Sequence, residues 1–432
     1  MSTRTNLVVP AIVAAGLALL ACASPAVTGI KVHMQNAEYQ EAVALADSVI
    51  ASGDSLDAEL WVWRGKAQGF LRQWEGAAES FQRAYALDNS LAPELADYWF
   101  VFYNSAALKV DAGDADGASA VLEEGKAIFT NRPEYDQMLG EIALNAGDYA
   151  LALQHFEQAW TISQPLIQSY RDMLEKAGDD QKAAVQEALD GAVNNALLSL
   201  YNAGMLHKSL AASASTPEES ETHLSQAKDL LNSALELDPT NADVLNLLAQ
   251  IYLLEHDIDS AMAVFDRALS AIDQGVSEGW LSAEDASSLR GQILTTRGAA
   301  LLETGQYDEA VSQLQAARQI VGDNYVVLGN LAQAYIMKQD YQSALPLLDA
   351  LVALPDLTSE ELANGWYMKF ADLTQLERDA EAAVALEKAL EYTPDNAEWW
   401  EYLASTYSRL GRRNDAIQAM QHAEMLRNPT RN

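Results

Sequence analysis

The chain has 432 residues, of which 49% are hydrophobic and 21% charged, a composition typical of a folded protein. Its 27 basic and 62 acidic residues give a net charge of −35, which argues against a nucleic acid as partner because phosphates would be repelled. One cysteine excludes an intrachain disulfide and a thiolate zinc cluster. With only 23 glycines and 11 prolines, a loop-rich all-β fold is not expected.

Residues 1–21 predict a secretory signal peptide. The apolar run Leu7–Ala21 has 15 residues, fewer than the roughly 20 that span a bilayer. The run ends in Leu-Leu-Ala before Cys22 and so resembles the lipoprotein signal of bacteria. The resemblance implies cleavage before Cys22, lipid attachment to its sulfur and a lipidated tether over residues 22–34. Because Ala23 follows the cysteine, it also implies an outer-membrane protein facing the periplasm. The alternative is an ordinary signal with an incidental cysteine.

Most of the remaining chain repeats one helical pattern. A leading alanine is followed four residues later by a large apolar residue, and three residues after that usually by a small one. The clearest copies begin at Ala77, Ala152, Ala227, Ala261, Ala310, Ala344, Ala382 and Ala416, and weaker copies begin at Ala42 and Ala118. Four of the intervals are 34 residues. A small residue, such as Gly65, Gly140 or Gly298, lies twelve positions before several leading alanines, where it would let two helices approach closely.

This pattern resembles the tetratricopeptide repeat (TPR), a helix–turn–helix unit of 34 residues, over about residues 35–428. The resemblance implies an all-α fold, a TPR-type solenoid of nine to ten helical hairpins wound as a right-handed superhelix. N-terminal TPR-like repeats are expected over residues 35–160 and C-terminal TPR repeats over residues 218–428. The copy at residues 95–130 is degenerate.

The longest interval, 75 residues, predicts an extended helical insertion over residues 161–217. We expect one helix over residues 148–177, kinked at Pro165, and a long partner helix over residues 180–212. Such a hairpin would extend beyond the regular solenoid and would suit a contact with a partner.

An interval of 49 residues separates two later copies of the repeat. Its 15 additional residues predict a loop over residues 274–280, followed by a lengthened helix over residues 282–304. Ser282 has Asp285 three positions later, a spacing that predicts an N-cap at the start of that helix.

No set of residues in the sequence predicts catalysis. The six histidines include no pair at helical spacing, and no phosphate-binding or nucleophile motif is present. The acidic stretch at residues 111–117 lacks the twelfth-position carboxylate of a calcium loop, because Leu122 stands there. We therefore expect a protein that is not an enzyme and has neither a cofactor nor a metal site.

The concave face of such a solenoid, lined by the first helix of each hairpin, is the expected surface for a protein or peptide partner. Counting from the bulky position of each first helix selects Val62, Lys66, Gln137, Glu141, Asn246, Gln250, Thr295, Ala299, Gly329, Gln333, Tyr367, Ala371, Glu401 and Ser405. Lys66 is the one positive charge among them, so the basic clamp with which TPR grooves bind a terminal carboxylate is absent. Alternatively, the amides of Asn246, Gln250 and Gln333 are merely solvated.

The final helix, about residues 413–427, predicts a second docking surface. Its apolar residues Ile417, Met425 and Leu426 form a candidate C-terminal patch for a partner or a second copy of the chain. Only five residues, 428–432, follow it in the sequence, and a capping helix is not expected there. The alternative is that the stems of three arginines (412, 413 and 427) cover the patch.

Taken together, these patterns predict a non-enzymatic, lipid-anchored TPR scaffold or adaptor of the bacterial cell envelope. Lipidated TPR proteins that this chain resembles assemble pili or outer-membrane proteins, or serve as adaptors for proteases and wall synthases. Its partners would be envelope proteins or peptides. The resemblance also implies a possible role in assembling an envelope complex. The alternatives are a self-assembling structural protein and a subunit of an envelope enzyme complex.

Overall fold

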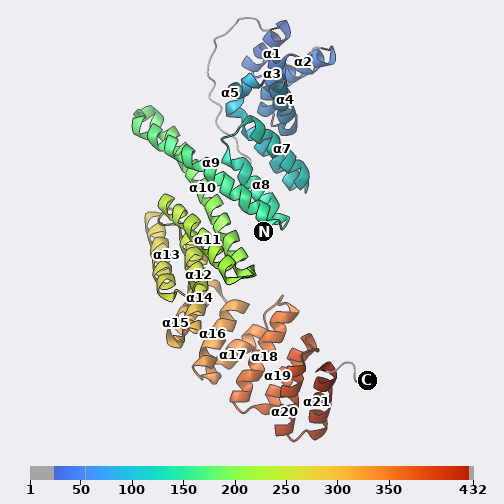
Figure 1. Ribbon diagram of the computed structural model, residues 1–432, viewed down its shortest axis with the longest axis vertical. Helices are drawn as coiled ribbons and strands as arrows, with labels where there is room; N and C mark the ends of the chain where they lie inside the picture. The colour runs from blue at the N-terminus through green and yellow to red at the C-terminus, as the bar shows by residue number, and fades with distance from the viewer. Residues whose placement is uncertain (1–23, 54, 428–432) are drawn as a thin grey trace. The chain divides into compact units, whose positions relative to one another are not determined.

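The computed structural model describes residues 24–53 and 55–427, and within them the chain forms 21 α-helices and no strand (Figure 1). The predicted all-α class is confirmed. None of these described helices combines the length and apolarity needed to cross a membrane. The predicted signal peptide and Cys22 lie outside the described residues. By internal contacts the chain divides into two compact units, Met1–Asp238 and Pro239–Asn432.

The N-terminal unit consists of helical hairpins in chain order. Its helices are α1 (Pro25–Gln35), α2 (Tyr39–Ala51), α3 (Ala58–Phe70), α4 (Trp74–Leu87), α5 (Ala92–Leu95), α6 (Phe100–Asp111), α7 (Ala115–Ile128), α8 (Pro133–Asn145), α9 (Tyr149–Lys176), α10 (Asp179–Ser213) and α11 (Pro217–Leu237). Consecutive helices pack as the pairs α1–α2, α3–α4, α6–α7, α8–α9 and α10–α11. The expected degenerate copy therefore still forms a pair, α6–α7.

The C-terminal unit has the same plan. Its helices are α12 (Ala242–Leu254), α13 (Ile258–Glu278), α14 (Ala283–Glu303), α15 (Tyr307–Val321), α16 (Tyr325–Met337), α17 (Tyr341–Val352), α18 (Ser359–Gln375), α19 (Asp379–Tyr392), α20 (Ala397–Arg409) and α21 (Arg413–Arg427). They form five pairs, α12–α13 to α20–α21. The described residues thus hold ten hairpins, in agreement with the prediction of nine to ten. The right-handed winding stays a prediction.

Small residues sit where the two helices of a hairpin touch. A Cβ atom added to Gly65 would lie 2.6 Å from the Phe81 ring, and one added to Gly298 would lie 2.5 Å from Leu314 Cγ. Both neighbouring side chains are fully buried, so neither has room to move. The repeated small residue in the sequence therefore marks a close contact between helices, as predicted.

The turns inside the hairpins place one residue in the left-handed region. Glycine fills this position at Gly147, Gly305 and Gly411, with φ between 74 and 78°, because it adopts positive φ without strain. Other hairpins use a side-chain residue there, such as His256 or Gln339, with φ of 58 and 62°. The turn geometry is retained even where the sequence lacks the glycine that signals it.

The predicted long helical hairpin is confirmed as α9–α10. Its helices have 28 and 35 residues, and Pro165 lies inside α9. The first half of α9 belongs to the hairpin with α8, and α10 also packs on α11. Between the extended halves lies a small core of Ile167, Leu189 and Ala196, with Trp160 packed against it. The insertion is therefore formed by the lengthened helices α9 and α10 of two neighbouring hairpins, α8–α9 and α10–α11.

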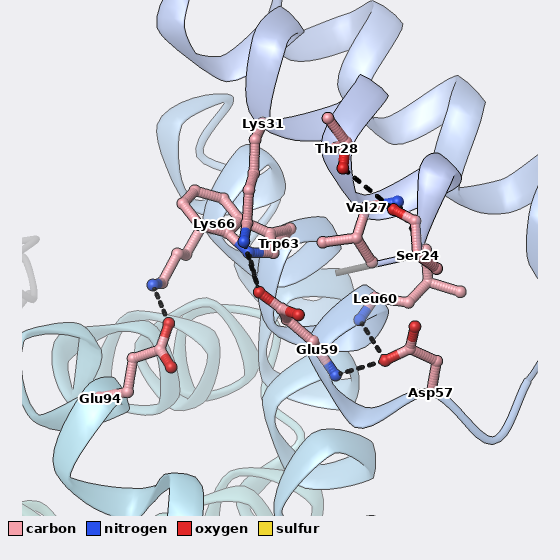
Figure 2. A network of polar contacts seen from close by, with 10 residues as sticks. All are labelled: Ser24, Val27, Thr28, Lys31, Asp57, Glu59, Leu60, Trp63, Lys66 and Glu94. Atoms are coloured by element: carbon pink, nitrogen blue, oxygen red, sulfur yellow. Dashed lines mark hydrogen bonds and ion pairs between the residues drawn. The ribbon is translucent and has the colours of Figure 1, made fainter. Parts of the chain in front are cut away.

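Two expected non-helical segments are helical instead. Residues 25–34, predicted as a tether, belong to α1, which buries Val27 and Ile30 completely against residues of α2 and α3. At the N-terminus of α1, Ser24 Oγ accepts a hydrogen bond from Val27 N at 3.2 Å (Figure 2). The predicted loop at 274–280 is wrong over residues 274–278, because α13 continues to Glu278 and only the last two residues are non-helical. The helix predicted at 282–304 is present as α14.

Candidate partner-binding surfaces

Two lysines lie near the ring of Trp63 on the first helices of the N-terminal hairpins (Figure 2). The ammonium groups of Lys31 and Lys66 lie 5.3 and 4.6 Å from the centre of the Trp63 ring. Each is also paired with a carboxylate: Lys31 with Glu59 at 2.6 Å and Lys66 with Glu94 at 2.8 Å. Because both ammonium groups already have a carboxylate partner within the chain, a partner carboxylate would gain less from either lysine than from an unpaired cation.

Several predicted groove residues are not available to a partner. Val62 is fully buried in the same cluster as Phe100 and Val101 of the next hairpin, so its assignment to the groove is wrong. Lys66 and Asn246 are also almost fully buried, at 8% and 9% exposed. The counting rule fails there because the next hairpin packs over the first helix. The predicted positions that keep some exposure are Glu141, Gln250, Thr295, Ala299, Gly329, Gln333, Tyr367, Ala371, Glu401 and Ser405.

An aromatic groove lies between α18 and α20 in the C-terminal unit. The Tyr367 ring stacks on Trp399, with centroids 4.8 Å apart and planes at 7°. Tyr402 lies 6.2 Å from Phe370, with planes at 21°. The groove has a volume of about 250 Å³ and is lined by Tyr367, Phe370, Ala371, Thr374, Gln375, Tyr402, Ser405, Thr406 and Arg409. Three predicted positions, Tyr367, Ala371 and Ser405, are thus brought together.

One charged side chain, Arg409, lines the aromatic groove. Its Nε donates a hydrogen bond to Asp379 Oδ1 at 2.8 Å, and Nη2 donates to Thr406 Oγ1 at 3.2 Å. The Tyr402 hydroxyl donates to Glu398, and this hydrogen bond raises the pKa of Tyr402 to about 12. At neutral pH the groove therefore offers aromatic faces, hydroxyls and a guanidinium held in place by an acid.

A second hollow, which we call the terminal hollow, lies between α20 and α21. It has a volume of about 330 Å³, shares Ser405 with the aromatic groove, and is lined by Glu401, Ala404, Ser405, Ser408, Arg413, Ala416, Ile417 and Met420. Glu401 lies at its edge, paired with Arg427 at 2.9 Å. The two hollows are therefore adjacent, with Ser405 of α20 in the lining of both.

The C-terminal apolar patch is exposed on α21. Ile417 is 56% exposed, and Met420 and Met425 are 43% and 47% exposed. Leu426 is half-buried. Arg412 is turned away, with its guanidinium 4.1 Å from the centre of the Tyr407 ring. Among the described residues, the arginine stems therefore leave Ile417 open. Met420, which was not among the predicted patch residues, joins it because it lies one helical turn from Ile417.

A histidine pair that sequence spacing does not reveal lies between α10 and α11. The two Nδ1 atoms of His207 and His223 are 2.9 Å apart, and His207 Nε2 lies 3.3 Å from Glu157 Oε1. Burial lowers the pKa of His207. One proton can be shared between the two facing Nδ1 atoms, whereas a proton on each of them would leave no acceptor for either. No group of three or more potential metal ligands is found among the described residues.

Asp372 on α18 is fully buried, and neither carboxylate oxygen has a hydrogen-bond partner. Burial raises its pKa from 3.8 to about 6. The folded state then binds the proton more tightly than the unfolded state, so stability falls as pH rises from about 4 through about 6. We expect Asp372→Asn to stabilise the C-terminal unit by about 1–3 kcal/mol at pH 7 and to have little effect below pH ~4. Urea unfolding across this pH range checks it; a gain independent of pH would contradict it.

Two family models match parts of the chain. Models of the tetratricopeptide repeat match residues 29–100, 220–281 and 301–358. The chain therefore contains TPR repeats. These matched stretches include four hairpins in whole or in large part, α1–α2, α3–α4, α12–α13 and α16–α17, and they agree with the 34-residue intervals of the leading alanines.

Two curated proteins resemble this chain over much of its length. It is 24% identical over 289 residues to TPR repeat-containing protein YpiA of Bacillus subtilis, covering 65% of this chain and 61% of that protein. It is also 24% identical over 314 residues to Superkiller complex protein 3 of Mus musculus, covering 71% of this chain and 18% of that protein. The chain thus spans less than two thirds of either relative.

Solved TPR structures are also similar. A tetratricopeptide repeat protein of Parabacteroides merdae is 15% identical with a TM-score of 0.40, covering 71% of this chain and 98% of that one. YrrB, described as a TPR protein with an unusual peptide-binding site, is 18% identical with a TM-score of 0.38, covering 46% of this chain and 93% of that one.

Proposed function

We propose that this protein is a non-enzymatic TPR scaffold, anchored by lipid at Cys22 in the bacterial cell envelope, that holds a protein partner. The observation that carries the proposal is the combination, in one chain, of TPR repeats and a sole cysteine placed directly after Leu-Leu-Ala at the end of an apolar run. TPR proteins generally act as scaffolds for protein–protein interactions. The anchor would sit in the outer membrane, with the hairpins in the periplasm.

The C-terminal unit is the part best suited to hold a partner. Its aromatic groove and terminal hollow are adjacent and share Ser405 in their linings, whereas the lysines on the N-terminal first helices are already paired with glutamates. Aromatic side chains and exposed aliphatic residues are the groups that most often carry binding energy at protein interfaces. The arrangement supports a partner segment with apolar anchors.

Cys22→Ala tests the anchoring. We expect the wild-type chain in the membrane fraction and the variant in the soluble fraction, because acyl chains contribute about 0.8 kcal/mol per buried methylene. Mass spectrometry of the N-terminal peptide should show acylated Cys22. Ser24→Ala, two positions away, should remain anchored as the matched control. An unmodified cysteine, or a Cys22→Ala chain that stays in the membrane, would refute the lipid anchor.

Exposed apolar residues at α21 also favour a second candidate, a self-associating structural protein. Sedimentation of the purified chain separates the two functions. A monomer that forms a defined complex with an envelope protein supports the scaffold, and concentration-dependent oligomers without a partner support self-assembly.

A further inference from the structure

The last described hairpin, α20–α21, differs in one respect from the hairpin before it. The leading alanines Ala382 and Ala416 are 34 residues apart, so Ala383 corresponds to Ile417 and Leu386 to Met420. Ala383 and Leu386 are 1% and 0% exposed, whereas Ile417 and Met420 are 56% and 43% exposed. Equivalent positions are therefore covered on α19 and open on α21.

Helix α20 provides the cover on α19. Its Leu403 and Tyr407 belong to the same apolar cluster as Ala383 and Leu386. Arg409 of α20 forms an ion pair with Asp379 at the start of α19 at 2.8 Å, and Arg412 in the turn after α20 lies 3.9 Å from Glu387 of α19. The interface that holds one hairpin on the next thus combines an apolar seam with ion pairs, of which Arg409–Asp379 lies at the start of α19.

At the position equivalent to Asp379, the last described hairpin carries the opposite charge. Arg413 stands 34 positions after Asp379, lines the terminal hollow and is exposed. Ten of the twelve lysines and arginines described in the C-terminal unit form ion pairs. The two without a carboxylate partner there are Arg267 and Arg413. In a protein with a net charge of −35, an unpaired arginine beside open apolar side chains is a position where a partner carboxylate would be stabilised.

We propose that the terminal hollow receives an amphipathic helix of a partner protein, seated on α20–α21 as α20 is seated on α18–α19. Its apolar side chains pack on Ile417 and Met420, and a glutamate or aspartate at the position equivalent to Arg409 pairs with Arg413. The inference rests on the proposed scaffold function and names the class of partner. The proposed contact has the same plan as the contact of α20 with α18–α19. The difference is that the cation lies on the receiving hairpin, at Arg413, and the carboxylate on the incoming helix.

A second copy of the chain fits this position less well. Arg409 lies seven residues before its leading alanine, and the residue seven before Ala42 on the first helix α1 is Gln35. A second copy docking through α1 would bring an amide to Arg413 in place of a carboxylate. Two chains of charge −35 also repel each other.

A charge-swap experiment with a defined probe tests the proposal. The probes are two labelled peptides that copy residues 396–410 of α20, one with the native sequence and one with Arg409→Glu. Fluorescence anisotropy measures their binding to the full-length chain in detergent, as wild type and as Arg413→Glu. We expect wild type to bind the Arg409→Glu peptide about fivefold more tightly than the native one, and Arg413→Glu to invert this preference.

Two further variants make the result specific. Ile417→Glu, checked for unchanged helix content by circular dichroism, should weaken both peptides at least about tenfold because it places a charge in the apolar seam. Arg267→Glu, the other unpaired cation of the unit, should leave both affinities unchanged. No binding of either peptide, equal affinities in all four charge combinations, or binding that survives Ile417→Glu would each overturn the proposal.

The inference and the proposed function fail in different experiments. If Cys22→Ala stays in the membrane while the charge swap behaves as expected, the anchor is wrong and the docking site stands. If the wild-type chain is lipidated and forms a complex in the envelope that Arg413→Glu and Ile417→Glu do not weaken, the scaffold stands and the terminal hollow is not its docking site.

Discussion

Replacing Phe156 with alanine is expected to lower the free energy of unfolding of the N-terminal unit by about 3–5 kcal/mol. The ring is fully buried and clusters with Ala143 of α8 and with Ala203 and Leu206 of α10. It also fills the space left by Gly140, where an added Cβ would lie 2.7 Å from it. Removing the ring leaves a cavity among small residues that cannot move in to fill it.

Urea unfolding followed by circular dichroism measures this loss, and hydrogen exchange should show it first in α8 to α10. Tyr149→Ala on the same helix is the control, because Tyr149 is 53% exposed and should change stability by no more than about 0.5 kcal/mol. Equal effects of the two substitutions would mean that Phe156 is not at the contact between hairpins.

Gly298→Leu is expected to destabilise the C-terminal unit by about 1–3 kcal/mol or more. Leu314 faces Gly298 from the paired helix, is fully buried, and would lie 2.5 Å from a Cβ at this position. The helices of the hairpin would have to separate. Gly298→Leu combined with Leu314→Ala should recover part of the loss, because the second change restores volume at the same contact.

Gly329→Ala provides the matched comparison within the same unit. An added Cβ there would lie 3.6 Å from Leu351, an ordinary contact, so the substitution should stabilise α16 by about 0.5–1 kcal/mol. Thermal unfolding of Gly298→Ala and Gly329→Ala should therefore shift in opposite directions. Shifts of the same sign would argue against the close approach of α14 and α15 at Gly298.

The hairpin architecture could be predicted because each helix carries its own periodic signal. Leading alanines such as Ala261 and Ala344 are fully buried, and their 34-residue intervals count one hairpin each. The α9–α10 hairpin was predictable for the same reason, since an interval of 75 residues leaves room for longer helices. The helix at residues 25–35 was missed because a cleavage site suggested a tether, although Val27, Ile30 and Met34 have helical spacing.

The binding surfaces could be predicted only in part, because exposure depends on which hairpin covers which helix. A rule counted from the bulky residue placed Tyr367 and Ser405 in a groove but also selected Val62, which the next hairpin buries. The reversed charge at Arg413 becomes meaningful only when Arg409 and Asp379 are seen to touch. Likewise, the His207–His223 pair joins residues 16 apart on two helices.

Site-specific photocrosslinking in cells tests the central claim, that the open end of α20–α21 is a partner-binding surface, most directly. A photoreactive amino acid replaces Ile417 in one strain and Val384 on α19 in another; these positions are 56% and 54% exposed, so solvent access is matched. We expect one discrete adduct with an envelope protein from position 417, lost with Arg413→Glu, and none from position 384. No adduct at 417, or the same adducts from both positions, would contradict it.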